Sequence, residues 1–219
     1  MRDQDKTPRD FMDKTDRTDH VVLPLLDDDT VRIIPLGGVE EVGRNMAAIE
    51  LKEGIIIVDA GFQFVSEDTA PGVDYVLPNT RYLEDNKDRI LGLFITHGHL
   101  DHIGGIPYII DRIGNPPIYT QHLTSLMIKK RQEEFAGVGP IVIHVMEPGG
   151  RIMLKGKAEG KGVVVKSFPV THSIPDSMGI SIETKHGNIV ISGDLRLEHK
   201  DGVPTEKEFK NWGALGREK

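Results

Sequence analysis

The sequence predicts a layered α/β sandwich, and three observations support this prediction. Short runs rich in β-branched residues recur along the chain, and each is closed by a turn signal, which is typical of β-strands. Several runs are apolar on both faces, as in sheets that other layers cover. Two further segments have the apolar spacing of helices, so strands and helices alternate with long strand-only stretches.

The expected strands start where an acidic N-terminal segment gives way to apolar runs. The predicted strands are Val31–Pro35, Ala47–Leu51, Ile55–Asp59, Leu91–Thr96, Ile118–Thr120, Ile141–Val145, Val163–Val170, Ile180–Thr184 and Asn188–Gly193. The predicted helices are Ile106–Ile113 and Leu123–Ala136. Near the end, Phe209, Trp212 and Leu215 have helix-like spacing, which predicts a short helix in an otherwise polar segment.

Charge divides the chain into three predicted parts. Residues 1–30 hold nine acidic and five basic side chains, and we expect them to form a disordered acidic tail. The alternative for this segment is a partner-binding arm. Residues 31–199 form the predicted folded domain, and residues 200–219 form a truncated polar C-terminal segment.

Composition excludes several classes of protein. The chain of 219 residues has no cysteine, which excludes disulfides, thiolate nucleophiles and cysteine zinc sites. The net charge of −7 argues against a protein that holds nucleic acid through bulk positive charge. The N-terminus has no apolar secretory core, and no run approaches the length of a membrane span. We therefore expect a cytoplasmic protein that does not contact membranes.

The most informative motif follows the predicted strand Leu91–Thr96. It reads HxHxDH and contains His97, His99, Asp101 and His102. In extended backbone His97 and His99 project to the same side, while the other two side chains are expected in the following turn. Imidazole and carboxylate together suit zinc, and this set offers ligands for two ions.

Three more polar side chains follow apolar strands. His172 lies just past Val163–Val170, and Asp194 lies past the strand that begins at Asn188. Each alone would more often be an ordinary turn residue, but the metal motif elsewhere favours a ligand role. Asp59 offers a carboxylate that can hydrogen-bond the ligand loop and hold its shape.

Four segments carry a family resemblance. The order Asp59, HGHLDH, His172 and Asp194 resembles the metallo-β-lactamase fold superfamily. The sequence motifs around these residues resemble those of ribonuclease J, a family within it. The segments that match are Leu36–Met46, Thr96–Tyr108, Thr171–Ser177 and Ser192–Pro204. The resemblance implies an αββα sandwich of the metallo-β-lactamase type.

The resemblance also implies a site and a reaction. One zinc ion would be held by His97, His99 and His172, and a second by Asp101, His102 and Asp194, with Asp194 bridging both. Manganese or magnesium is the alternative to zinc at this site. The implied function is a ribonuclease with 5′-to-3′ exonuclease and endonuclease action on RNA, involved in rRNA processing and mRNA decay.

The expected chemistry is hydrolysis of a phosphodiester by a metal-bound hydroxide. Asp101 would orient that nucleophile and accept its proton, and Asp194 would act as the shared metal ligand. Ser173 and Ser177 could donate hydrogen bonds to a non-bridging phosphate oxygen. Their alternative role is capping of the turn beside Pro175.

The chain departs from the ribonuclease J pattern at its end. We expect an incomplete sandwich, the first half only, because the β-CASP domain, the C-terminal domain and the family's late histidine lie beyond Lys219 in that pattern. His199 is the one histidine after Asp194 and is an alternative ligand, although a solvated loop residue is expected there.

Two other functions compete with the ribonuclease. The same dinuclear site could serve a small-molecule hydrolase such as a β-lactamase or lactonase. Alternatively, the chain is a non-catalytic fragment that forms a homo-oligomer or needs a partner chain to complete the fold, since an unfinished sheet leaves an open edge.

Overall fold

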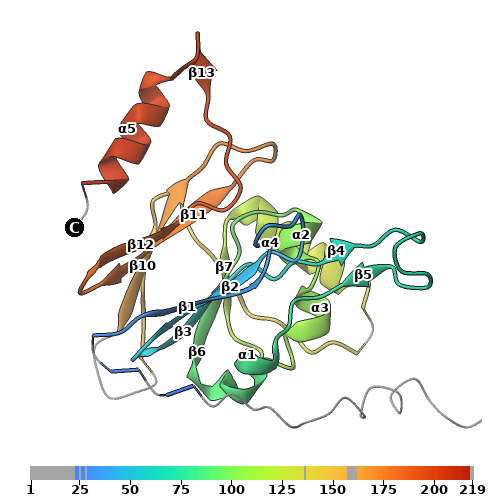
Figure 1. Cartoon of the computed structure of the whole chain (residues 1–219). Coiled ribbons are helices and arrows are strands. Elements are labelled where there is room, and N and C mark those ends of the chain that lie inside the picture. Colours follow the sequence, from blue (N-terminus) through green and yellow to red (C-terminus); the bar gives the residue numbers. More distant parts are fainter. Residues whose placement is uncertain (1–22, 25, 28, 136, 157–161, 218–219) are drawn as a thin grey trace, which may run out of the picture.

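The computed structural model describes residues 23–24, 26–27, 29–135, 137–156 and 162–217, and two β-sheets packed face to face dominate it (Figure 1). The first sheet has the order β1-β2-β3-β6-β7-β8 and the second the order β12-β11-β10-β9. In the first sheet, β3, β6, β7 and β8 run parallel, whereas all neighbours in the second sheet are antiparallel.

The elements have the following bounds. The first sheet comprises β1 (Arg32–Gly37), β2 (Met46–Leu51), β3 (Gly54–Val58), β6 (Ile90–Phe94), β7 (Ile118–Thr120) and β8 (Ile143–Val145). The second comprises β9 (Arg151–Leu154), β10 (Val163–Pro169), β11 (Met178–Thr184) and β12 (Gly187–Ile191). Two small hairpins are β4 (Gln63–Phe64) with β5 (Tyr75–Val76), and β13 (His199–Lys200) with β14 (Val203–Pro204). The helices are α1 (Arg81–Asp85), the 3₁₀ turn η2 (Lys87–Arg89), α2 (Leu100–Ile103), α3 (Ile106–Ile109), α4 (His122–Gln132) and α5 (Glu206–Leu215).

The first sheet is covered on both faces, which explains why its strands are apolar throughout. In β3, Ile55 and Ile57 pack in the core formed with the helices, whereas Ile56 and Val58 pack in the core between the sheets. All five residues of β3 are buried. Alternate side chains thus enter two different cores, as expected for a central strand between two layers.

Helix α5 contacts the second sheet at the end of β10 (Figure 1). Val163 and Val165 of β10 point into the core between the sheets, so Phe168 points to the outer side. The Phe168 ring meets the Trp212 ring edge to face at 5.7 Å. The predicted sandwich of two packed sheets, with helices on the first sheet, is confirmed, as is the short C-terminal helix.

The predicted elements differ from the observed ones mainly at their ends. All nine predicted strands are present, and each predicted end lies within two residues of the observed end. Helix α3 stops at Ile109, and turns replace its predicted second half up to Ile113. Strand β9 and the two hairpins were not predicted, because they are too short to show a strand pattern in the sequence.

The two predicted tails are only partly described. Residues 1–22, 25 and 28 lie outside the described residues, so the disordered acidic tail stays a prediction. At its end, Pro24 O accepts a hydrogen bond from Arg32, and Asp29 is ion-paired with Lys185. Among the described residues, no helix has the length and apolar character needed to cross a membrane.

Candidate metal centre

The candidate centre lies where loops from both sheets meet. His97 follows β6 of the first sheet, whereas His172 follows β10 and Asp194 follows β12 of the second. A backbone hydrogen bond of 2.9 Å from Met178 N to Thr96 O joins the two sheets beside these loops. Side chains separated by almost a hundred residues in sequence therefore converge at one edge of the sandwich.

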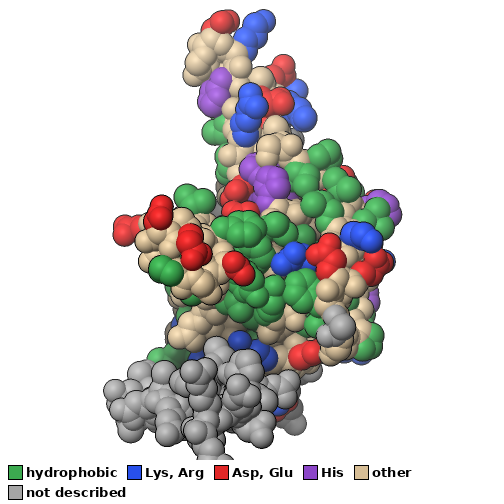
Figure 2. Space-filling model, turned by 90° about the vertical axis from the view of Figure 1, so that its right-hand side faces the viewer, with side chains coloured by type: hydrophobic (Ala, Val, Ile, Leu, Met, Phe, Trp, Pro, Cys, Tyr) green, Lys and Arg blue, Asp and Glu red, His purple; other side chains and the backbone are tan. Residues whose placement is uncertain are grey.

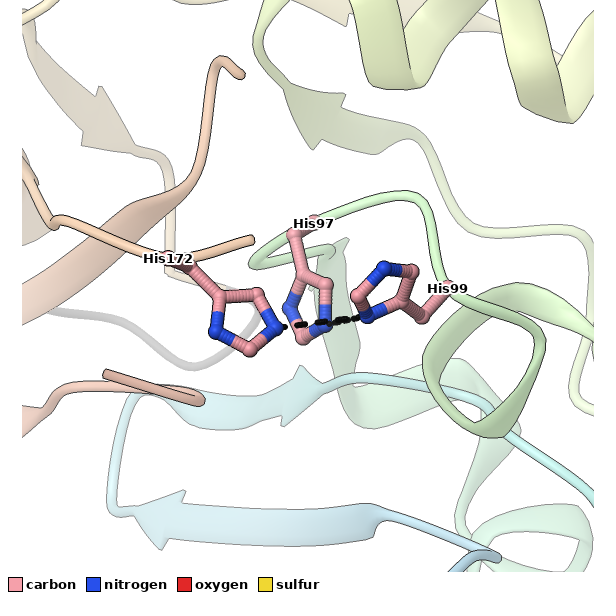
Figure 3. Close-up of side chains that lie close together, drawn as sticks. All are labelled: His97, His99 and His172. Atoms are coloured by element: carbon pink, nitrogen blue, oxygen red, sulfur yellow. Dashed lines mark hydrogen bonds between the residues drawn. The ribbon is translucent and has the colours of Figure 1, made fainter. Parts of the chain in front are cut away.

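Three histidines turn their ring nitrogens toward one another (Figure 3). His97 Nε2 lies 3.0 Å from His99 Nδ1, and His172 Nε2 lies 3.3 Å from the same His99 nitrogen. Nitrogens bound tetrahedrally to one zinc ion at ordinary bond lengths are separated by about 3.3 Å. The separations and the donor type of these three side chains therefore fit a zinc-sized ion.

Burial favours the neutral, metal-binding form of two of these histidines, His97 and His172. His97 has no exposed surface, and burial together with the neighbouring histidines, His102 first, lowers its pKa to about 2. Burial also lowers the pKa of His172, which outweighs the opposing effect of Asp194. Neutral imidazoles offer a lone pair to a cation, so these two rings are prepared to act as ligands.

A second group forms beside the first. His97, His102 and Asp194 make up this group, and His102 Nε2 lies 3.5 Å from Asp194 Oδ1. Asp101 borders it, with Oδ2 at 3.6 Å from the same nitrogen. Asp194 Oδ2 also lies 3.8 Å from His172 Nε2, so this carboxylate stands between the two groups. The structure thus brings together all six ligands that the resemblance implied, with Asp101 at the border of the second group.

Asp59 orients His102 by binding the ring nitrogen that faces away from the centre. Its carboxylate accepts hydrogen bonds of 2.8 Å from the Thr96 backbone N–H and from His102 Nδ1. Burial lowers the pKa of His102, but the charge of Asp59 and this hydrogen bond outweigh burial and raise that pKa to about 8. With Nδ1 turned to the carboxylate, Nε2 faces the centre, which is how carboxylates orient metal-binding histidines.

The end of the HxHxDH motif differs from the expectation. Asp101 and His102 lie in the short helix α2 and not in a turn. The backbone of a distant loop sets this conformation, because Ala60 N donates to His102 O at 2.8 Å. A Cβ atom on Gly61 would lie 1.5 Å from Asp101 O, so only glycine permits this approach.

Asn45 was not predicted as a site residue. Its Nδ2 donates to Asp101 Oδ2 at 3.1 Å and also lies 3.1 Å from His102 Nε2. Its backbone N–H donates to Asp101 O at 3.0 Å. Asn45 stands in the glycine-rich motif that supported the resemblance, but nothing in its local sequence marks it as a partner of residues about 56 positions away.

The two predicted substrate serines lie in different surroundings. Ser177 is buried, and its hydroxyl donates to Ile174 O at 2.9 Å. Ser173 is exposed beside the centre, with its hydroxyl 3.5 Å from His172 Nε2. Substrate binding by either serine stays a prediction. His199 is exposed in β13 and belongs to neither ligand group within the described part of the chain.

The comparison with known families matches most of the chain. The family model of the metallo-β-lactamase superfamily aligns with residues 39–215, which include every candidate ligand described above. The chain belongs to the metallo-β-lactamase superfamily. Two solved structures share this fold: a protein of unknown function from Enterococcus faecalis V583 (TM-score 0.52, 18% identity, 75% of this chain and 43% of that one) and a mutant metallo-β-lactamase of Cronobacter sakazakii (0.50, 16%, 80% and 64%). At these identities the likeness shows the fold alone.

Within this superfamily, the similar curated proteins are ribonucleases J. The chain is 37% identical to ribonuclease J of Mycoplasma pneumoniae over 171 residues, which are 78% of this chain and 29% of that protein. It is 37% identical to ribonuclease J 1 of Streptococcus pyogenes serotype M3 over 188 residues, 86% and 32% of the two chains. The predicted resemblance is confirmed, and the chain spans about a third of the length of these relatives.

Exposed apolar side chains lie in the glycine-rich loop that precedes Asn45 and in the β4–β5 hairpin. Val39 and Val42 are exposed in the glycine-rich loop, and Phe64 is exposed on β4. A Cβ atom on Gly43 would lie 2.8 Å from the Cβ atom of Gln63, so this loop rests on the β4–β5 hairpin. Figure 2 shows apolar side chains gathered on the face that carries the hairpin, with histidines nearby and basic side chains scattered among the described residues of this face.

Proposed function

We propose that this chain is the metal-binding part of a ribonuclease J-like ribonuclease that hydrolyses RNA phosphodiesters. The observation behind the proposal is the convergence of His97, His99 and His172 beside His102, Asp194 and Asp101. The similarity to ribonucleases J supports RNA as the substrate class. Combined 5′-to-3′ exonuclease and endonuclease action, with roles in rRNA processing and mRNA decay in the cytoplasm, is part of the proposal.

The proposed cofactor is a pair of zinc ions, for which manganese or magnesium can substitute. His97, His99 and His172 would hold one ion, and His102, Asp101 and Asp194 the other, with Asp194 shared. When bound, such a pair lowers the pKa of water and offsets negative charge on the phosphate. Asp194 fits the shared role because its two oxygens face His102 and His172 respectively.

The remaining steps belong to side chains of this chain. Asp101 orients the attacking water and accepts its proton, and the Asn45 amide holds the Asp101 carboxylate in place. Asp59 maintains the orientation of His102 throughout. Ser173, exposed beside His172, donates to a non-bridging phosphate oxygen. Ser177 is the second proposed donor, although in this structure its buried hydroxyl donates to Ile174 O.

The charge of the described domain suggests that long RNA is bound mostly by other parts of the assembly. Residues 31–219 carry 25 acidic and 22 basic side chains, so the described domain offers little bulk attraction for a polyanion. We therefore also propose that a partner chain, or a second copy of this chain, contributes to binding long RNA.

Metal content is the first test of this proposal. Elemental analysis of a monodisperse, chelator-free sample is expected to give about two zinc ions per chain. Cleavage of a 5′-monophosphorylated RNA should then depend on added metal and disappear in the His97→Ala, His99→Ala double variant. His186→Ala, on an exposed turn, is the matched control and should retain cleavage.

Two results would contradict the proposal. RNA cleavage that persists in the double variant would identify the activity as a contaminant. Rapid hydrolysis of a chromogenic β-lactam, with RNA left intact, would assign the site to small-molecule hydrolysis instead.

A further inference from the structure

Helix α5 reaches the candidate centre through one buried carboxylate. Glu208 lies in the first turn of α5, and only 4% of its surface is exposed. Its Oε1 accepts a hydrogen bond of 2.9 Å from Thr171 Oγ1, and its Oε2 accepts one of 3.0 Å from Trp212 Nε1. Thr171 directly precedes the ligand His172, so the carboxylate is one residue removed from the centre.

The local sequence would assign Glu208 a different role. Thr205 is the N-cap of α5, and its hydroxyl accepts from Glu208 N at 3.4 Å. A threonine followed three residues later by glutamate is the capping-box pattern, in which the glutamate accepts from the N-cap backbone N–H. Here the Thr205 N–H donates to Glu198 O at 2.8 Å instead. The carboxylate is thereby free to bind Thr171.

Thr171 also connects the two ligand loops of the second sheet. Its carbonyl oxygen accepts a hydrogen bond of 2.7 Å from Arg196 N, two residues past Asp194. One residue thus contacts the segment that follows Asp194 through its backbone and α5 through its hydroxyl. A shift of Thr171 would move His172 and would loosen the loop that carries Asp194.

We propose that Glu208 is a positioning residue, which holds Thr171 and through it sets the orientation of His172 toward the metal. The role rests on the proposed metal function and extends it to a helix that contains no ligand. Groups that orient metal ligands commonly change metal affinity by about 10- to 100-fold when they are removed. Because Glu208 acts through an intervening residue, we expect an effect near the lower end, about tenfold.

The test measures zinc affinity by competition with a chromophoric chelator, together with the visible spectrum of the cobalt-substituted protein. Glu208→Met keeps the side-chain length and removes both acceptors, and Thr171→Val removes only the hydroxyl. Each is expected to weaken zinc binding about tenfold and to change the cobalt spectrum. The double variant should bind no more weakly than the weaker single variant, because both changes break one connection.

Three controls separate positioning from general stability. Glu208→Gln keeps a hydrogen-bonding group and should restore most of the affinity. Glu206→Met alters an exposed glutamate of the same helix, which pairs with Lys210, and should leave the affinity unchanged. Trp212→Phe removes the other hydrogen bond to Glu208 and should lower the unfolding midpoint of the metal-free protein without changing zinc affinity.

The possible failures have different meanings. Unchanged zinc affinity in Glu208→Met and Thr171→Val, with only a lower unfolding midpoint, would make Glu208 purely structural and overturn the inference. Additive effects of the two substitutions would overturn it as well. Absence of zinc binding in the parent chain would instead overturn the proposed function and, with it, this role.

Discussion

Replacement of Asp59 by asparagine should remove a pH dependence of folding in the metal-free protein. The pKa of His102, 2% exposed beside Asp59, rises from its ordinary 6.5 to about 8 on folding. At 1.36 kcal/mol per pKa unit, this rise corresponds to about 2 kcal/mol. Because the folded pKa is the higher one, this stabilisation is complete below pH 6.5 and is lost as the pH rises through 8.

The neighbouring histidines affect a different pH range. The pKa of His97 is lowered to about 2, so acidification below 6.5 protonates the unfolded chain preferentially and destabilises the fold. Stability without metal should therefore peak near pH 6.5. Above that pH, the decrease in the free energy of unfolding should come from the deprotonation of His102.

Denaturant unfolding in the presence of a chelator, measured across this pH range, tests the reasoning. The parent protein should lose about 2 kcal/mol of unfolding free energy between about pH 6.5 and 9, and Asp59→Asn should be nearly flat there. Asp74→Asn, on an exposed segment, is the control and should keep the parent slope. A slope that survives in Asp59→Asn would show that this carboxylate does not raise the His102 pKa.

Three further substitutions test separate parts of the fold. Gly61→Ala places a Cβ atom 1.5 Å from Asp101 O, so it should displace α2 and abolish the zinc binding of the second group, measured by calorimetry. The control is Gly139→Ala, whose Cβ atom meets only Asp111 Oδ1 at 3.5 Å, and it should leave zinc binding unchanged. Gly213→Ala within α5 meets only the flexible end of Arg217 and should raise the free energy of unfolding by about 0.5–1 kcal/mol, since alanine favours helix; a decrease would contradict the described packing of α5. Glu50→Gln should cost about 3 kcal/mol in chemical denaturation, because buried Glu50 pairs with Arg32 and Arg89. Burial raises the pKa of Glu50, but hydrogen bonds from Tyr82 and Arg89 outweigh it and lower that pKa, so this stabilisation is present above pH 4.5 and lost on further acidification; equal acid sensitivity of parent and variant would refute it.

The sandwich could be predicted because its strands are marked locally. The run from Ile55 to Val58 is apolar at every position, and such a run indicates a strand covered on both faces. The ligand motif was equally visible, since His97, His99, Asp101 and His102 lie within six residues. These features depend on near neighbours in the sequence.

Features that depend on distant contacts could not be predicted. Helix α2 forms where the motif alone suggested a turn, because the backbone near Gly61 binds it. Asn45 and Glu208 act on residues about 56 and 37 positions away, respectively. At the start of α5, the Thr205 N–H donates to Glu198 O, a contact that no local pattern predicts.

Because the candidate ligands come from both sheets, a bound ion would cross-link the two layers. An ion held jointly by His97 and His172 would require the ends of β6 and β10 to stay close together, so separation of the two sheets would release the ion. Free metal at a hundredfold excess over its dissociation constant would add about 2.7 kcal/mol to the free energy of unfolding. Loss of the metal would then lower the stability of the chain and raise its susceptibility to proteolysis, even in the absence of substrate.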